Sequence, residues 1–201
     1  AEGSQKGSLS LAQLHAMIDA NERMKYDTRN RNLLKTRNAL LLKFLYLTAA
    51  RRSEAANLKW EDLQQDGEFQ VVILQQTKSG EPQKLKLRRE LFEELECWNE
   101  TLKTNQIECE WVFPSLSFRT LGGKMSGKGV NDVVSKLGSA IGLKISAHYL
   151  RHTAITLALE LGEPLQKVQS YARHASANTT IRYFHDQQFL EKNPTDRLPM
   201  I

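Results

Sequence analysis

Hydrophobic residues recur at helical spacing from the start of the chain. Ser10 and Gln13 have the spacing of a capping box, which marks the beginning of a helix. The apolar residues that follow fall on one helical face: Leu11, Leu14, Met17 and Ile18. This pattern predicts a helix over residues 10–20, and the charged residues 21–32 predict a loop after it.

The second hydrophobic segment, residues 32–49, is apolar on almost every side. A helix of this kind is buried on several sides, so we expect it at the centre of the core. Ser53 and Glu54 predict the start of another helix directly afterwards. Arg51 and Arg52 would then lie at the junction between the two helices.

The pattern changes from helical to extended at Phe69. The segment FQVVILQQ is rich in β-branched residues, TKSGEPQ has the composition of a turn, and KLKL alternates with a period of two. These features predict a β-hairpin or a small sheet. We expect a helix over 89–103, a short strand in EWVFPS, a loop over 117–129 and a helix over about 130–141, followed by a mostly helical remainder.

The chain is therefore expected to form one mixed α+β domain, mainly α with a small antiparallel β-sheet. No repeat, low-complexity block or linker divides it after residue 9. Residues 1–8 are small and polar, and we interpret them as a flexible lead or a cloning remnant. The domain would span residues 9–185, and residues 186–201 would form a polar tail that either frays or packs through its few apolar residues.

The composition limits the possible partners and the cellular location of the protein only slightly. The chain has 201 residues and a net charge of +5, an excess compatible with an anionic partner but too small to identify one. Cys97 and Cys109 have no CxxC spacing and no nearby histidine, which argues against structural zinc and favours a reducing, cytoplasmic location. The longest apolar run, ALLLKFLYLTAA, contains Lys43 and is shorter than the ~18–20 residues of a membrane span.

One helix start carries an unusual concentration of cation-capable side chains. The segment SAHYLRHTAITLALELG places His148, Arg151 and His152 in the first turns of an otherwise apolar helix. The N-terminal end of a helix favours anions, so a bound phosphate would explain these residues. The two histidines have i, i+4 spacing, but no HExxH glutamate or third ligand accompanies them, which disfavours a metal site.

Four segments in order resemble the tyrosine recombinases, also called phage-type integrases. TAARRSEAANLKWEDL (48–63) is similar to the family pattern Thr-Gly-x-Arg-x-Ser-Glu, TKSG (77–80) lies at a hairpin turn, and HYLRHT (148–153) matches His-x-x-Arg-His. ARHASANTTIRYF (172–184) keeps a tyrosine nine residues after a histidine. Each match alone has an ordinary structural explanation, but four at family-like separations favour the resemblance, which covers residues 9–185.

The resemblance implies an enzyme that cleaves and rejoins DNA strands through a 3′-phosphotyrosine intermediate. It implies six catalytic residues: Arg51, Lys78, His148, Arg151, His174 and Tyr183. The arginines and histidines would hold the scissile phosphate, the lysine would protonate the leaving oxygen, and the tyrosine would be the nucleophile. Glu54 would orient one of the arginines or histidines. Tyr171 is a weaker candidate nucleophile, because it belongs to an apolar helical pattern.

The same resemblance implies partners and cofactors. The expected partner is double-stranded DNA, with a homo-oligomer, a tetramer, assembled on DNA by the full-length protein and with no membrane association. No metal, other cofactor or nucleotide is expected, because the cations stabilise the phosphate charge and the phosphotyrosine link conserves the energy of the broken bond. Family members usually carry a further N-terminal DNA-clamping domain and often lend their C-terminal tail to a neighbouring protomer. We therefore interpret this chain as the catalytic part of a longer protein.

Two departures from the family pattern stand out. Ala49 occupies the glycine position before Arg51, which is a mild change if the backbone there avoids positive φ. Arg173 stands where a glycine usually precedes the second histidine, and its guanidinium could contact DNA or cap the preceding helix. The other candidate DNA contacts are Lys84, Lys86 and Lys128. The alternatives are a catalytically inactive DNA-binding relative, a type IB topoisomerase, or accidental matches.

Overall fold

The structure is a computed structural model, which describes residues 7–26, 28–75, 77, 80–173 and 193–201. Its α-helices are α1 (Leu11–Arg23), α2 (Arg31–Thr48), α3 (Arg52–Ala56), α4 (Arg89–Thr104), α5 (Gly127–Ala140), α6 (Ala147–Glu160) and α7 (Leu165–Ala172). The strands are β1 (Leu63–Asp66), β2 (Phe69–Leu74) and β3 (Gln83–Lys86), and short 3-10 helices are η1 (Trp60–Asp62), η2 (Phe118–Thr120) and η3 (Pro194–Arg197). The prediction of a mainly helical fold with a small antiparallel sheet is confirmed.

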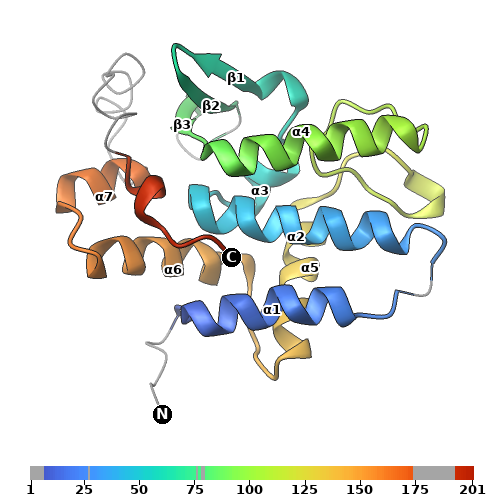
Figure 1. Cartoon of the computed structure of the whole chain (residues 1–201), viewed down its shortest axis with the longest axis horizontal. Coiled ribbons are helices and arrows are strands. Elements are labelled where there is room, and N and C mark those ends of the chain that lie inside the picture. Colours follow the sequence, from blue (N-terminus) through green and yellow to red (C-terminus); the bar gives the residue numbers. More distant parts are fainter. Residues whose placement is uncertain (1–6, 27, 76, 78–79, 174–192) are drawn as a thin grey trace.

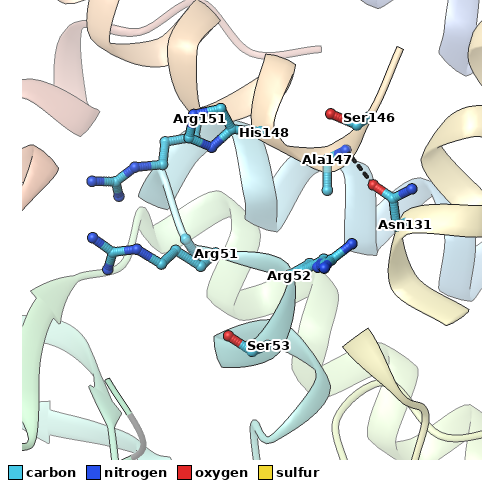
Figure 2. Close-up of a pocket in the computed structure, with 9 residues that line it drawn as sticks. Arg51, Arg52, Ser53, Asn131, Ser146, Ala147, His148 and Arg151 are labelled. Atoms are coloured by element: carbon cyan, nitrogen blue, oxygen red, sulfur yellow. Dashed lines mark hydrogen bonds between the residues drawn. The ribbon is translucent and has the colours of Figure 1, made fainter. Parts of the chain in front are cut away.

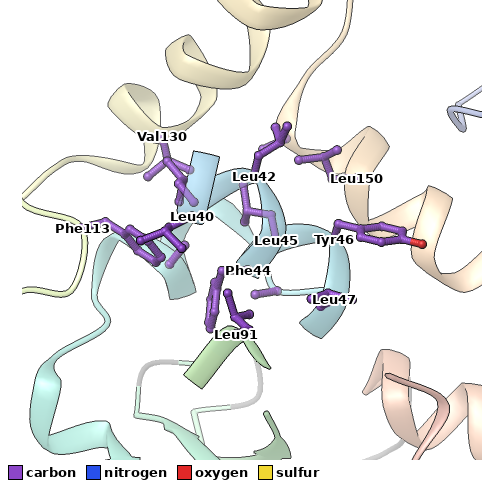
Figure 3. Close-up of a cluster of buried hydrophobic side chains, with 14 of the residues drawn as sticks. Leu40, Leu42, Phe44, Leu45, Tyr46, Leu47, Leu91, Phe113, Val130 and Leu150 are labelled. Atoms are coloured by element: carbon purple, nitrogen blue, oxygen red, sulfur yellow. The ribbon is translucent and has the colours of Figure 1, made fainter. Parts of the chain in front are cut away.

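Helix α2 forms the centre of the core, as its all-round apolar sequence predicts. It lies between α4 and α1 and also packs against α5 and α6 (Figure 1). Figure 3 shows its buried side chains meeting Leu91 of α4, Val130 of α5 and Leu150 of α6, all fully buried. Phe44 and Phe113 add an aromatic contact with ring centroids 5.6 Å apart. Helix α2, which ends just before Arg51, is therefore held firmly by its neighbours.

The predicted helix boundaries are close to the observed ones. The capping box of α1 is present, because the Ser10 hydroxyl accepts a hydrogen bond from the Gln13 amide and the Gln13 side chain accepts one from Ser10. Among the described residues, no helix is long and apolar enough to cross a membrane.

The sheet contains the two predicted strands, β2 and β3, and a further strand, β1, that the sequence does not predict. It is antiparallel in the order β1-β2-β3, with Leu63 opposite Val72 and Val72 opposite Leu85. Strand β1 escaped prediction because its sequence, LQQD, contains no β-branched or aromatic residue. The strand predicted in EWVFPS is wrong: this segment makes only two isolated bridges, from Trp111 to Lys59 and from Pro114 to Lys124.

The last described residues pack against their own chain. Thr195 donates a hydrogen bond through Oγ1 to the Leu47 carbonyl at 2.7 Å, and Arg88 donates through Nη1 to the Leu198 carbonyl at 2.7 Å. Leu198 is 1% exposed. Residues 193–201 lie beside α6 and α7 (Figure 1). Packing of the tail on a neighbouring protomer stays a prediction.

Candidate active site

Arg51 is positioned by the sharp turn that ends α2. Ala49 is left-handed, with φ 53° and ψ 27°, and redirects the chain so that Arg51 becomes the residue preceding α3. The condition under which alanine would be a mild change here, a backbone without positive φ, is therefore not met, because the turn needs the conformation that glycine adopts most easily. Glu54 then fixes Arg51: Oε2 accepts the Arg51 amide at 2.7 Å, and Oε1 accepts Nη1 at 3.0 Å.

The first turn of α6 presents His148 and Arg151 toward Arg51. The preceding residue, Ser146, makes no side-chain cap bond to α6. The Ala147 amide instead donates to Oδ1 of Asn131, on α5, at 2.9 Å (Figure 2). Sequence reasoning missed Asn131, because no local pattern links a capping side chain to a helix that begins 16 residues later.

These elements enclose a cavity of about 370 Å³. Its polar lining residues come from the start of α3, from α5 and from the start of α6: Arg51, Arg52, Ser53, Asn131, Ser146, His148 and Arg151. In Figure 2 the side chains of Arg51 and Arg151 extend in the same direction from α3 and α6. A cavity with this excess of positive charge at a helix N-terminus favours an anion.

Arg151 is buried and anchored to backbone carbonyls. Nη1 donates to Ala49 O at 2.6 Å, and Nη2 donates to Ala172 O. Burial, together with the nearby charges of Arg173 and Arg51, lowers the pKa of Arg151 to about 10. The guanidinium is still charged at neutral pH. The backbone carbonyls at the ends of α2 and α7 therefore hold the Arg151 side chain in place.

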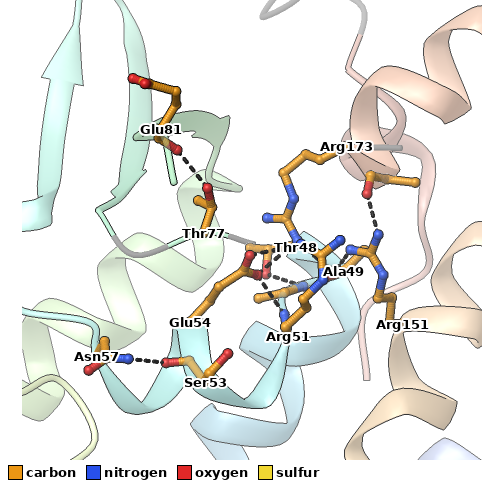
Figure 4. A network of polar contacts seen from close by, with 12 residues as sticks. Thr48, Ala49, Arg51, Ser53, Glu54, Asn57, Thr77, Glu81, Arg151 and Arg173 are labelled. Atoms are coloured by element: carbon orange, nitrogen blue, oxygen red, sulfur yellow. Dashed lines mark hydrogen bonds and ion pairs between the residues drawn. The ribbon is translucent and has the colours of Figure 1, made fainter. Parts of the chain in front are cut away.

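Arg173 joins the same cluster rather than the outer surface. Its side chain is 4% exposed, and Nη2 donates to Oε2 of Glu54 at 2.9 Å and to Ala49 O at 3.1 Å (Figure 4). Burial lowers the pKa of Arg173, opposed by the attraction of the Glu54 carboxylate. Arg51 and Arg173 share the Glu54 carboxylate, and Arg151 joins them through the Ala49 carbonyl, so the cluster holds an excess of positive charge.

Three of the predicted catalytic residues lie outside the described residues: Lys78, His174 and Tyr183. Near the first of them, the Thr77 hydroxyl donates to the Glu81 carbonyl at 2.6 Å, which fits the turn predicted in TKSG.

The candidate DNA-contacting lysines lie away from the cavity lining and each pairs with a carboxylate. Lys84 lies 2.6 Å from Asp66, Lys86 lies 2.5 Å from Asp196, and Lys128 lies 2.7 Å from Asp132. Lys128 is the most exposed of the three, at 83% of its side chain. Their contact with DNA stays a prediction.

His148 and His152, one helical turn apart on α6, form a ring pair. Their ring centroids are 4.3 Å apart, with the planes nearly perpendicular. Within the described part of the chain, no three His, Cys, Asp or Glu residues come together as metal ligands.

Comparison with known proteins assigns the family. The model of the phage integrase family matches residues 8–189. The chain belongs to this family. It is 31% identical over 84% of its length to a tyrosine recombinase of Synechococcus elongatus, and 33% identical over 73% of its length to the tyrosine recombinase XerA of Pyrococcus horikoshii. These matches cover 53% and 50% of the relatives, so the integrase chain spans about half the length of the curated relatives it matches.

Solved structures agree on the fold. The XerH recombinase bound to its difH substrate superimposes with a TM-score of 0.67 at 22% identity, covering 92% of this chain and 52% of that one. The lambda integrase catalytic core gives a TM-score of 0.61 at 19% identity, covering 83% of this chain and 91% of that one. The family does not favour the topoisomerase and inactive-relative alternatives.

Proposed function

We propose that the chain is the catalytic region of a site-specific DNA recombinase that cleaves and rejoins strands through a 3′-phosphotyrosine intermediate. The observation that carries the proposal is the convergence of Arg51, His148 and Arg151 on one cavity at the start of α6. Relatives named tyrosine recombinases support the same activity.

The proposed reaction exchanges one phosphodiester bond of the DNA for a phosphotyrosine bond. The phenolic oxygen of Tyr183 attacks the scissile phosphorus, while the bond to the 5′ oxygen breaks and its electrons leave with that oxygen. Lys78 protonates the leaving oxygen, and a histidine or water takes the phenolic proton. Attack by a 5′ hydroxyl reverses the step, so the total number of phosphodiester links is conserved.

The arginines supply the charge stabilisation. Guanidinium forks bind two phosphate oxygens at once and keep their charge throughout the reaction. Preorganised donors of this kind contribute about 3–4 kcal/mol each in comparable sites. We propose that these cations make a metal ion and ATP unnecessary.

The proposed partner is double-stranded DNA in the cytoplasm. Among structural neighbours, XerH is bound to its difH substrate, and lambda integrase forms a tetramer bound to a Holliday junction. By analogy, we propose that the full-length protein assembles as a homo-tetramer on DNA. Lys128 and the other predicted lysines would add phosphate contacts that carry no sequence information.

Covalent trapping tests this function. The chain is incubated with a pool of nicked, randomised duplexes and denatured with detergent, and the DNA that stays attached is sequenced. We expect a 3′-phosphate adduct that disappears in Tyr183→Phe, while Tyr149→Phe, a control at the start of α6, keeps it. An adduct that persists in Tyr183→Phe would overturn the nucleophile assignment. Absence of any adduct, also with the full-length protein, would overturn the recombinase proposal in favour of an inactive DNA-binding relative.

A further inference from the structure

Arg173 combines the backbone of a helix cap with a buried charge. Its backbone is left-handed, with φ 57° and ψ 40°, a common way to end a helix but one that favours glycine. Its charged side chain is buried, although an exposed arginine would be fully hydrated. Both features cost stability, so the contacts of the guanidinium must hold it in place.

Those contacts link the two arginines of the candidate phosphate site. Nη2 of Arg173 donates to Oε2 of Glu54, whose other oxygen accepts Nη1 of Arg51. The same Nη2 donates to the Ala49 carbonyl, which also accepts Nη1 of Arg151. Figure 4 shows the three guanidinium groups around this carboxylate and carbonyl.

The position of Arg173 limits what Glu54 can offer to Arg51. A carboxylate can accept two parallel hydrogen bonds from one guanidinium. Here Oε2 is occupied by Arg173 and by the Arg51 amide, which leaves Oε1 for the Arg51 side chain. The rest of the Arg51 fork is then available to an anion in the cavity. Without Arg173, Oε2 could draw a second donor of Arg51 away from the cavity.

Arg173 also adds charge that the described residues do not balance. Its Nε and Nη1 are buried and have no hydrogen-bond acceptor among those residues. One carboxylate, Glu54, pairs with two guanidinium groups, those of Arg51 and Arg173, and the third, that of Arg151, lies nearby without its own carboxylate among the described residues. The resulting positive potential is directed at the place where we propose that the phosphate binds.

We propose that Arg173 is a positioning residue for the phosphate site. By occupying Oε2 of Glu54, it leaves part of the Arg51 fork for the scissile phosphate, and by sharing the Ala49 carbonyl with Arg151, it ties the turn before Arg51 to α6. This inference rests on the recombinase function proposed above. It assigns Arg173 an indirect role, distinct from the DNA contact considered from the sequence.

Single-turnover cleavage at saturating DNA separates these roles. Glycine suits the left-handed backbone, so Arg173→Gly should fold. We expect its cleavage rate to fall roughly 10- to 100-fold, because small misplacements of catalytic groups have effects of this size. DNA affinity should change less than about threefold, with the same salt dependence. Arg173→Lys should restore the rate only in part, because an ammonium lacks the planar fork. The control Arg23→Ala removes one exposed charge at the end of α1 and should change neither quantity.

Two outcomes would overturn the inference. An unchanged cleavage rate in Arg173→Gly would reduce Arg173 to a helix cap. A weaker affinity with a salt slope lower by about one, at an unchanged maximal rate, would make it a DNA contact.

A stability cycle tests the inference independently of activity. We expect the urea midpoint shifts of Arg173→Gly and Glu54→Gln to be non-additive in the double variant, because the two groups share a buried ion pair. Additive shifts would overturn the inference. If neither the unaltered chain nor the full-length protein forms an adduct, the recombinase proposal fails while this cycle still reports on Arg173.

Discussion

At the scale of single residues, the candidate site concentrates backbone strain. Ala49 and Arg173 have φ values of 53° and 57°, at the two positions where the family pattern has glycine. A left-handed conformation costs a residue with a side chain about 1–2 kcal/mol. The Ala49 carbonyl accepts hydrogen bonds from Arg151 and Arg173, so the strained turn also holds the arginine cluster together.

Replacing Ala49 tests this strain. Ala49→Gly should stabilise the chain by about 0.5–1 kcal/mol, because relief of strain exceeds the extra chain entropy of glycine in the unfolded state. The measurement is urea denaturation. Ala50→Gly is the matched control, since Ala50 is equally buried but lacks positive φ, and it should destabilise. Destabilisation of similar size in both variants would contradict the strain.

The motif residues could be predicted from the sequence, but their surroundings could not. Arg51, His148 and Arg151 stand in short patterns that remain recognisable without coordinates. The φ value of Ala49 and the burial of Arg173 depend on how distant helix ends meet. A short sequence pattern carries no information on how these helix ends pack against each other.

At the scale of elements, α5 positions α6. Asn131 caps α6 from the neighbouring helix, and Gly138 lies against the loop that joins the two helices. A Cβ atom at Gly138 would approach Cγ1 of Ile145 to 2.4 Å. The close approach of these helices therefore sets where His148 and Arg151 point.

The N-terminus of α6 is capped by a residue of another helix, so we expect Asn131 to matter more for stability than Ser146 at the N-cap position. Asn131→Ala should lower stability by about 1 kcal/mol, the usual effect of losing an N-cap hydrogen bond. Ser146→Ala, at the N-cap position itself, should be nearly neutral, because its side chain makes no cap bond. Thermal unfolding of the two variants measures the difference. Equal losses would show that Ser146 contributes to the cap in solution.

Packing of α5 against the following loop gives a second prediction at this scale. Gly138→Ala should destabilise by about 1–3 kcal/mol, as overpacking does, because Ile145 and the Leu143 carbonyl leave no room for Cβ. Gly129→Ala, in the same helix, meets only ordinary contacts at 3.5 Å and beyond, and should be neutral or stabilising. Urea denaturation compares them, and a neutral Gly138→Ala would refute the tight approach.

At the scale of the whole molecule, the C-terminal segment closes the fold on itself. Lys86 and Arg88, at the end of the sheet, contact Asp196 and the Leu198 carbonyl. Thr195 contacts the last turn of α2. The described tail thus connects the sheet, the central helix and α6 within one chain.

Leu198→Ala tests this closure. Removing a side chain that is 1% exposed should lower stability by about 2–4 kcal/mol. Because the contact is within one chain, the loss should not depend on protein concentration. Met200→Ala, at a partly buried neighbour, should have a smaller effect. A loss that grows on dilution would instead indicate a tail exchanged between protomers.

The overall architecture was more predictable than its details. The apolar α2 and the period-two pattern of β3 determine the fold class directly. Strand β1 is not predicted because LQQD lacks β-branched and aromatic residues, although its partner β2 follows directly. The irregular path of EWVFPS could not be predicted, because its partners lie elsewhere in the chain: the Val112 amide donates to the Leu58 carbonyl, and the Val112 carbonyl accepts from Nε1 of Trp98. Local composition records propensity but not these distant partners.

Arg51 and Arg151 are proposed to neutralise the scissile phosphate, and removing the charge from the substrate distinguishes this role from a purely structural one. Single-turnover cleavage by the unaltered chain and by Arg151→Ala would be compared on the trapped site carrying either a phosphate or an uncharged methylphosphonate at the cleaved position. With the phosphate, Arg151→Ala should lose roughly 10²- to 10³-fold in rate. With the methylphosphonate, the two proteins should cleave at similar rates, because there is no charge left to neutralise. An equally large loss on both substrates would contradict the account.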